Sequence, residues 1–343
     1  MSNKEDEIIY KKKVNLTDRH NRKHNYLRIS LTDRCNFRCM YCMPDEKIKF
    51  TPQESQMNAE ELLTITKEFV EAGVQKIRLT GGEPLIRKDI QTILKGLSQM
   101  PVELAMTSNG LLLNDYFDLL KEVNLKVLNV SLDTLKPEKF YQMTKRNEFD
   151  KVWHNILLAI EKGFKVKLNT VLIKDFNDDE ILDLAELSLH HNLQVRFIEF
   201  MPFDGNCWDF TKMITEKEIL ASVYYKYPKN TVKKLSLKKH ATAKNYKLSG
   251  SKGSFGIISS VTNPFCDTCN RLRLTSDGRM KNCLFSNDEA DLLTLFRQGK
   301  SIKETVNLLV LKKYAIRAGM EKLSDFKTSN QHSLNRSMVR IGG

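Results

Sequence analysis

The chain has 343 residues, of which 41% are hydrophobic and 28% are charged, and it carries a formal net charge of +13 at pH 7. This length allows one large domain or two ordinary ones. The sequence contains no apolar run of about 18 residues, so we expect no membrane-spanning segment and no membrane partner. The positive charge fits a polyanionic small molecule, an anionic surface or nucleic acid.

The most basic stretch runs from Lys226 to Lys247. Only Tyr227 and Tyr246 could stack on bases within it, whereas nucleic-acid surfaces usually combine basic and aromatic side chains. We therefore favour a solvated lysine-rich surface and expect no nucleic-acid partner.

Along the chain, residues 1–22 are polar and charged, which predicts a flexible N-terminal arm. Short β-rich runs then alternate with amphipathic helical segments. Leu62, Ile65 and Phe69, for example, share one helical face, and Gly73 follows where that helix should end. The strands that the sequence predicts are Leu27–Leu31, Lys76–Leu79, Val102–Met106, Val127–Leu132, Val166–Ile173 and Gln194–Phe200.

Six strand–helix repeats in series predict a parallel sheet with crossover helices. Polar motifs follow nearly every strand, so we expect an α/β fold in which residues 23–225 form an incomplete (βα)6 TIM-like barrel, with the active site at the carboxyl ends of the strands. Thr215–Val223 should be the last helix of that barrel. Residues 226–343 should form a smaller C-terminal region that includes helices at Asn287–Gln298 and Ile302–Ala318.

Six of the seven cysteines fall into two groups of three. They are Cys35, Cys39 and Cys42 in a C-x₃-C-x₂-C motif, and Cys266, Cys269 and Cys283 in a C-x₂-C-x₁₃-C motif. A closed zinc site usually needs four thiolate or imidazole ligands, whereas three thiolates on a [4Fe–4S] cluster leave one iron open to another ligand. The spacing therefore favours two iron–sulfur clusters, one for each group.

Two other uses of these cysteines stay open on spacing alone. Zinc sites completed by histidine are possible, although no histidine has a matching spacing. Disulfides need an oxidising compartment, and the polar start of the chain shows no secretory signal. The seventh cysteine, Cys207, belongs to neither group and is expected to be an ordinary buried thiol.

Polar motifs after successive predicted strands suggest a shared pocket, although each alone is typical of a turn. Three of them are Thr80-Gly81-Gly82-Glu83-Pro84, Thr107-Ser108-Asn109-Gly110 and Ser131-Leu132-Asp133. At the other end of the chain, Gly342-Gly343 is either a frayed terminus or a thin tail that can enter a crowded pocket, because glycine has no Cβ.

The first cysteine motif with Tyr41, together with Gly81-Gly82-Glu83-Pro84, resembles the radical S-adenosylmethionine (SAM) superfamily. The second cysteine group, the Arg271-Leu272-Arg273 between its Cys269 and Cys283, and the final Gly342-Gly343 are similar to one family within that superfamily, the GTP 3′,8-cyclases of molybdenum cofactor biosynthesis. The resemblance runs from about Tyr26 to Gly343, nearly the whole chain, and the combination of motifs is highly specific.

The resemblance implies a role for each matching residue. Two [4Fe–4S] clusters would be held by the metal ligands Cys35, Cys39 and Cys42, and by Cys266, Cys269 and Cys283. SAM would be lined by Tyr41, Gly82, Ser131 and Met201, with Glu83 nearby. GTP would be contacted by Arg28, Arg78, Thr107, Lys167, Arg271, Leu272 and Arg273. The catalytic residues would be Arg271, Arg273, Gly342 and Gly343.

The implied reaction converts GTP to 3′,8-cyclo-7,8-dihydro-GTP through a 5′-deoxyadenosyl radical made from SAM. The resemblance further implies a reduced flavodoxin- or ferredoxin-like electron donor, hand-over to a cyclic pyranopterin monophosphate synthase, and a homodimer. It places the enzyme in the cytoplasm, or in the mitochondrial matrix if the source is eukaryotic. The alternatives are a radical SAM maturase that acts on a peptide and an RNA-binding zinc protein.

Overall fold

A computed structural model describes residues 14–43, 48–206, 208–237, 239–328 and 335–342 of the protein. Within them the strands form one curved sheet in the order β12-β11-β10-β1-β2-β3-β4-β5-β6-β9-β8-β7. The strand bounds are β1 (Tyr26–Ser30), β2 (Lys76–Thr80), β3 (Glu103–Ser108), β4 (Val127–Ser131), β5 (Lys165–Leu172), β6 (Gln194–Glu199), β7 (Val232–Lys234), β8 (Lys244–Leu248), β9 (Ser254–Ile258), β10 (Arg271–Leu274), β11 (Arg279–Lys281) and β12 (Glu289–Asp291).

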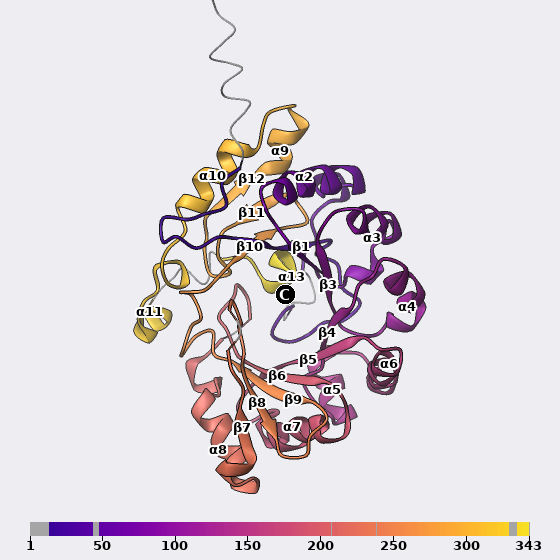
Figure 1. Ribbon diagram of the computed structural model, residues 1–343, viewed down its shortest axis with the longest axis vertical. Helices are drawn as coiled ribbons and strands as arrows, with labels where there is room; N and C mark the ends of the chain where they lie inside the picture. Colours follow the sequence, from indigo (N-terminus) through magenta and orange to yellow (C-terminus); the bar gives the residue numbers. More distant parts are fainter. Residues whose placement is uncertain (1–13, 44–47, 207, 238, 329–334, 343) are drawn as a thin grey trace, which may run out of the picture.

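Strands β1 to β6 lie side by side in chain order, and every neighbouring pair is parallel. The helices that connect them cover the outer face of the curved sheet (Figure 1). The helix bounds are α2 (Ala59–Glu71), α3 (Ile90–Ser98), α4 (Leu113–Glu122), α5 (Pro137–Thr144), α6 (Phe149–Glu161), α7 (Ile181–His190), α8 (Glu216–Lys226), α9 (Leu292–Arg297), α10 (Lys303–Leu311), α11 (Leu323–Thr328) and α13 (Met338–Ile341). All six predicted barrel strands are confirmed within a residue or two.

Helix α2 shows why these local sequences fold as expected. Asn58 caps its first turn and exchanges hydrogen bonds with Glu61, so that two backbone amides at the helix start are satisfied. Its buried face carries Leu62, Ile65 and Phe69, as the periodicity predicts. Gly73 follows with φ +107°, a conformation that few residues other than glycine adopt, and ends the helix.

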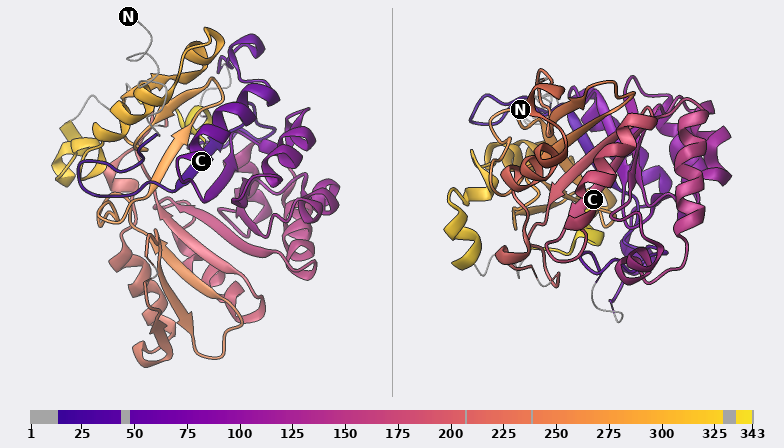
Figure 2. Two further views of the ribbon diagram at one scale, coloured as in Figure 1. Left: turned by 45° about the horizontal axis from the view of Figure 1, so that its top comes forward. Right: turned by 90° about the horizontal axis from the view of Figure 1, so that it is seen from below.

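The C-terminal strands extend the barrel sheet at both of its edges. Strand β10 pairs in parallel with β1, and β9 pairs in parallel with β6. The antiparallel strands β11–β12 and β7–β8 lie beyond them, so the sheet ends at β12 and β7 and does not close. The incomplete barrel is therefore confirmed, and strands from residues 226–343 form part of its wall (Figures 1 and 2).

Three segments differ from the sequence-based expectation. The helix expected over Ile302–Ala318 ends at Leu311, and Arg317 and Ala318 have positive φ values that no α-helix allows. A helix was predicted from Asn287, but residues Glu289–Asp291 form β12, whose pairing with β11 holds them extended until α9 begins at Leu292. The segment from Val14 to Arg22, expected to be flexible, packs against the molecule, since Val14 and Leu16 are buried in the core and Asp18 is only 3% exposed. No helix among the described residues is long and apolar enough to cross a membrane.

Candidate active site

The interior of the barrel is lined by cations. In β1, Leu27 and Ile29 point outward into the hydrophobic core, so that Arg28 between them points inward. Arg28 lies beside Arg78 of β2 in the sheet, and Arg196 of β6 also faces the interior. The three guanidinium groups are buried close to one another, and a polyanion would offset this concentrated positive charge.

Lys167 of β5 shows how strong this positive field is. Burial, followed by the charges of Arg196, Arg78 and Lys76, lowers the pKa of Lys167 to about 7. Burial likewise lowers the pKa of Arg28 and of Arg196 to about 10. An anion that entered this space would favour the protonated lysine and reverse the shift.

The first cysteine group lies on the loop after β1, and its three thiols line a cavity of about 310 Å³ at the carboxyl ends of the strands. The loop is held by Arg38, whose Nη1 donates to the carbonyl of Cys35 at 2.6 Å. Burial raises the pKa of Cys42 to about 12 and that of Cys35 to about 11. Burial and then the charges of Cys35 and Cys42 raise the pKa of Cys39 well above its usual range, so the three sulfurs are close neighbours.

The second cysteine group lines the same cavity from the C-terminal side. The amide of Arg317 donates to Cys266 Sγ at 3.5 Å, and Nζ of Lys313 donates to Cys269 Sγ at 3.6 Å. Burial raises the pKa of Cys269, but the charges of Arg271 and Lys313 outweigh it and lower that pKa to about 6. This thiol is therefore poised to be an anionic metal ligand.

Neither cysteine group forms a compact site for a single metal ion among the described residues. Among the described residues, no three Cys, His, Asp or Glu side chains converge closely enough to hold one ion. A cluster has several irons, so its thiolate ligands stand further apart than those of a zinc ion. All six thiols are free within the described part of the chain, which removes the disulfide alternative there. Cys207 lies outside the described residues.

All four residues predicted to contact SAM line this cavity: Tyr41, Gly82, Ser131 and Met201. The hydroxyl of Tyr41 donates to Asp133 at 2.9 Å, which fixes the ring. A Cβ on Gly82 would come within 2.0 Å of the carbonyl oxygen of Arg34, so only glycine lets the two loops approach. Glu83 is fully buried, and its carboxylate accepts the amides of Asn109 at 2.7 Å and Leu85 at 3.1 Å. Burial raises its pKa to about 7.

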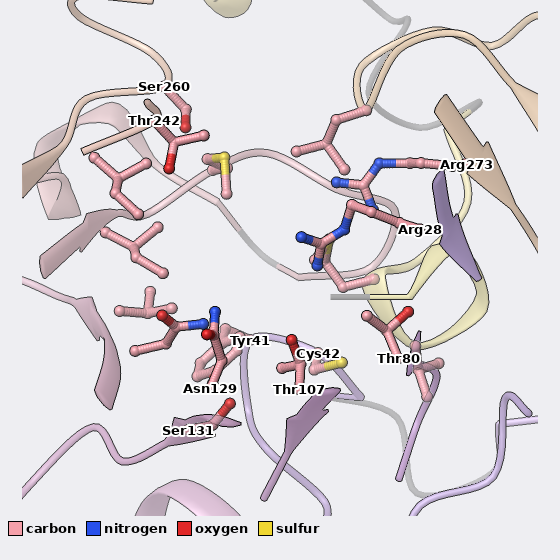
Figure 3. A pocket seen from close by; sticks show the side chains of 18 of the residues that line it. Arg28, Tyr41, Cys42, Thr80, Thr107, Asn129, Ser131, Thr242, Ser260 and Arg273 are labelled. Atoms are coloured by element: carbon pink, nitrogen blue, oxygen red, sulfur yellow. The ribbon is translucent and has the colours of Figure 1, made fainter. Parts of the chain in front are cut away.

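Of the residues predicted to contact GTP, Arg28, Thr107, Arg271 and Arg273 line the cavity. Figure 3 shows Arg28 and Arg273, which are paired across β1 and β10, both extending into the cavity from one end of it, with Tyr41 and Asn129 at another. Arg78 and Lys167 lie deeper, and Arg78 donates to the hydroxyl of Tyr26 at 2.6 Å. The side chain of Leu272 is 1% exposed and packs in the core, because strand alternation places it opposite the arginines on either side. The predicted contact of Leu272 to GTP therefore stays a prediction that concerns its backbone.

Gly342 sits at the mouth of the barrel. Its carbonyl accepts a hydrogen bond from Nη1 of Arg273 at 2.6 Å, and a Cβ there would lie 2.3 Å from Oγ1 of Thr80. Helix α13, which precedes it, lies within the ring of strands (Figure 1), and its Val339 lines the cavity. Gly343 lies outside the described residues.

Several cavity residues were missed by the sequence analysis. Arg196 could have been found, because alternation along Gln194–Glu199 puts it on the inward face. Asn169 belongs to the polar run Lys167-Leu168-Asn169 that the sequence places at the end of the fifth strand, whereas Asn129 was not singled out, and both side chains line the cavity. The Oδ1 atoms of both asparagines and Oγ1 of Thr107 are buried and have no hydrogen-bond partner among the described residues. Such groups call for a ligand that supplies donors.

Comparisons with known proteins agree with this site. A model of the radical SAM superfamily matches residues 29–188, and a model described as Molybdenum Cofactor Synthesis C matches residues 193–322. The solved structure of Streptococcus suis SuiB aligns with a TM-score of 0.59 over 94% of this chain and 78% of that one, at 15% identity, and shares the fold. The fold and the first cysteine motif are thus those of a radical SAM protein, which binds SAM and an iron–sulfur cluster.

Curated relatives narrow the class. GTP 3′,8-cyclase of Peptoclostridium acidaminophilum is 41% identical over 96% of this chain and 98% of its own length. The mitochondrial GTP 3′,8-cyclase of Arabidopsis thaliana is 44% identical over 96% and 83%. Molybdenum cofactor biosynthesis protein 1 of Dictyostelium discoideum is 42% identical over 96% of this chain. That relative is longer, and this chain spans about half of its length (52%). The chain belongs to the GTP 3′,8-cyclase family.

Proposed function

We propose that this protein is a GTP 3′,8-cyclase, which converts GTP to (8S)-3′,8-cyclo-7,8-dihydroguanosine 5′-triphosphate in the first step of molybdenum cofactor biosynthesis. The observation that carries the proposal is a single cavity with one cysteine triad on each side and the cationic barrel interior beneath it. A radical formed at one triad and a nucleotide held at the other would meet within this cavity.

The first triad would hold a [4Fe–4S] cluster, and Tyr41, Gly82, Ser131 and Met201 would line SAM beside it. When bound, this cluster and SAM would supply a 5′-deoxyadenosyl radical that takes the hydrogen atom from C3′ of GTP. The C3′ radical would then add to C8 of the guanine, and one further electron and a proton would give the closed-shell product. The protein's own contribution is to orient both molecules. Tyr41 is fixed by Asp133 for this purpose, and Gly82 allows the backbone to approach closely.

The second triad would hold another [4Fe–4S] cluster and would face the guanine. Arg28, Arg271, Arg273 and Thr107 would contact GTP in the cavity, while Arg78 and Lys167 would supply charge from deeper in the barrel. Guanidinium groups bind phosphate oxygens through paired, charge-assisted hydrogen bonds, so this arrangement suits a triphosphate. The unpartnered Oδ1 atoms of Asn129 and Asn169 can accept from amino or hydroxyl groups of the ligands.

The end of the chain would complete the catalytic residues. Gly342 accepts from Arg273, which itself lines the cavity, and we infer that Gly342 and Gly343 hold this arginine and Arg271 in place for the reacting nucleotide. Val339 of the same segment lines the cavity beside the first triad and helps to close it to solvent, and so to dissolved hydrogen donors that would quench a radical.

The wider setting follows from the family. We infer a reduced flavodoxin- or ferredoxin-like protein as electron donor, a cyclic pyranopterin monophosphate synthase as the next enzyme, and a homodimer. The location would be the cytoplasm or the mitochondrial matrix. The relative from Arabidopsis thaliana is named as mitochondrial, whereas the name of the Peptoclostridium acidaminophilum relative gives no location.

The direct test is anaerobic reconstitution with iron and sulfide, followed by incubation with GTP, SAM and a chemical reductant. Formation of 5′-deoxyadenosine together with a cyclised GTP product supports the proposal. Cleavage of SAM that is not stimulated by GTP, with GTP recovered unchanged, would instead indicate another radical SAM reaction.

A further inference from the structure

Lys313, two residues beyond the end of α10, is a buried lysine with unusual partners. Lys313 is only 3% exposed. Its Nζ donates to the carbonyl oxygen of Arg271 at 2.9 Å and to Cys269 Sγ at 3.6 Å. Within the described part of the chain no carboxylate oxygen lies within 4.0 Å of this ammonium group. A buried cation needs a nearby anion, and the sulfur of Cys269 is the group in position to provide it.

The segment that carries Lys313 is fixed from the other end of the sequence. Arg22 donates to the carbonyl oxygens of Tyr314 at 2.7 Å and Ala315 at 2.8 Å, and also to that of Cys266 at 2.9 Å. Asp18 orients this guanidinium through a hydrogen bond of 2.7 Å. One buried arginine therefore ties residues 314–315 to the cysteine loop, and the lysine beside them has a defined position relative to the sulfurs.

The surroundings of the two triads differ in the sign of their charges. Carboxylates stand near the first triad, since Glu83 interacts with Cys35 and Asp133 with Cys39. The hydrogen bonds to sulfur there come from neutral groups, such as the amide of Phe37 on Cys35 at 3.4 Å. The second triad instead has two cations beside Cys269, the guanidinium of Arg271 and the ammonium of Lys313, whose Nζ donates to the sulfur.

We propose that Lys313 is the charge-compensating cation of the second cluster, that it favours the reduced form of that cluster, and that it holds Cys269 in register with Arg271. This inference rests on the proposed second cluster. Reduction adds one negative charge to a cluster, and a buried positive charge in contact with a ligand sulfur stabilises that charge. Lys313 contacts both a cluster ligand and the backbone of a substrate-facing arginine, so it is a positioning residue that also sets the potential.

The test uses the full chain with Cys35, Cys39 and Cys42 all replaced by serine, so that the second cluster is observed alone. This parent is compared with Lys313→Met, Lys313→Gln, Lys313→Arg and Lys312→Met after anaerobic reconstitution. Lys312 is the matched control, because it is the exposed neighbour and its replacement removes the same charge. Iron and sulfide content is measured first, and a redox titration followed by electron paramagnetic resonance gives the midpoint potential.

Lys313→Met and Lys313→Gln should lower the reduced-to-oxidised ratio at a fixed applied potential by roughly tenfold, which is about 59 mV for a one-electron couple. In Lys313→Arg and Lys312→Met this ratio should stay within about twofold of the parent value, which corresponds to a shift in midpoint potential of about 18 mV by the same relation. A midpoint for Lys313→Met and Lys313→Gln that equals the Lys312→Met value overturns the proposal.

Other outcomes are also decisive. Loss of the cluster in both neutral variants, with retention in Lys313→Arg, supports charge compensation. Loss in Lys313→Arg as well shows that Lys313 acts through packing and contradicts the inference. A parent that takes up no iron and sulfide refutes the second cluster itself, which is a failure of the proposed function and not of Lys313.

Discussion

At the scale of single residues, strand alternation explains most of the site. Arg271 and Arg273 face the cavity, and Leu272 between them is buried in the core. The motif was visible in the sequence, but the opposite roles of its members follow from the pleat of β10. The resemblance assigns one role to the whole motif, whereas the strand geometry shows which of its side chains face the cavity and which face the core.

Arg271 gives the first prediction. Its guanidinium lies over the ring of Phe265, 4.5 Å from the centroid, and lines the cavity. Arg271→Ala should weaken GTP binding by about ten- to a hundredfold, the loss of a charge-assisted contact worth roughly 1.5–3 kcal/mol. Isothermal calorimetry measures this, with Arg279→Ala on β11 as a control outside the cavity. Equal affinity in the two variants would show that Arg271 does not touch GTP.

Gly342 gives a second prediction. It has φ +84°, and a Cβ would lie 2.3 Å from Oγ1 of Thr80. Gly342→Ala should therefore displace the end of the chain from Arg273 and lower cyclisation at least about tenfold, while SAM cleavage and the melting temperature change little. Gly250→Ala is the control, because Gly250 has φ +75° with nothing within 4 Å of a Cβ. Full turnover by Gly342→Ala would make this glycine passive.

Lys167 gives a prediction on pH. Its pKa is lowered to about 7 by burial and then by neighbouring cations, and a bound triphosphate would raise it again. GTP affinity should be constant below pH 7 and should fall as the pH rises above 7, because binding then requires uptake of a proton. Binding assays between pH 6 and 9 follow this, and Lys167→Arg should abolish the decline. A decline that persists in Lys167→Arg would assign it to another group.

At the scale of elements, the barrel strands and helices were predictable because their signals are local. Strand alternation, helical periodicity and Gly73 all act within a few residues. The pairing of β10 with β1 and of β9 with β6 could not be predicted, because it joins segments far apart in the chain and leaves no local signal in the sequence. Strand β12 was read as helix for the same reason: its partner β11 decides its conformation.

The two cysteine triads lie in different segments of the chain, and replacing a cysteine in each should abolish a different part of the reaction. Cys39→Ser should stop SAM cleavage, whereas Cys269→Ser should leave GTP-independent SAM cleavage measurable and remove cyclisation. Each variant should retain about half of the roughly eight irons expected for two clusters. Iron analysis, 5′-deoxyadenosine and product are measured on the same preparations. Wild-type cyclisation by Cys269→Ser without its second cluster would refute the division of roles.

At the scale of the whole molecule, distant parts of the chain meet at the second triad. Arg22 near the N-terminus and the segment after α10 both donate hydrogen bonds to the loop that carries Cys266 and Cys269. This convergence explains why residues 14–22 are ordered although their composition predicts a flexible arm. Their polar side chains find buried partners only once the C-terminal segments are in place, so a sequence window could not reveal them.

Arg22 tests this convergence. It pairs with Asp18 and donates to three carbonyl oxygens, of Cys266, Tyr314 and Ala315, in a part of the molecule where Asp18 is 3% and Arg22 9% exposed. Arg22→Met would remove the charged partner of the buried Asp18 and the guanidinium that donates to the three carbonyl oxygens, which should lower the free energy of unfolding by about 3–5 kcal/mol. The same change should reduce occupancy of the second cluster and spare the first.

Thermal unfolding and iron content measure the two effects, and Arg19→Met is the matched control. Arg19 is exposed, and its guanidinium lies over the ring of Tyr314, 5.8 Å from the ring centroid. Arg19→Met therefore removes the same charge but no buried hydrogen bond. Arg22→Lys should recover part of the stability, since one ammonium cannot reach all three carbonyls. Cluster content and melting temperature in Arg22→Met that match those of Arg19→Met would show that the N-terminal segment merely rests on the second site without supporting it.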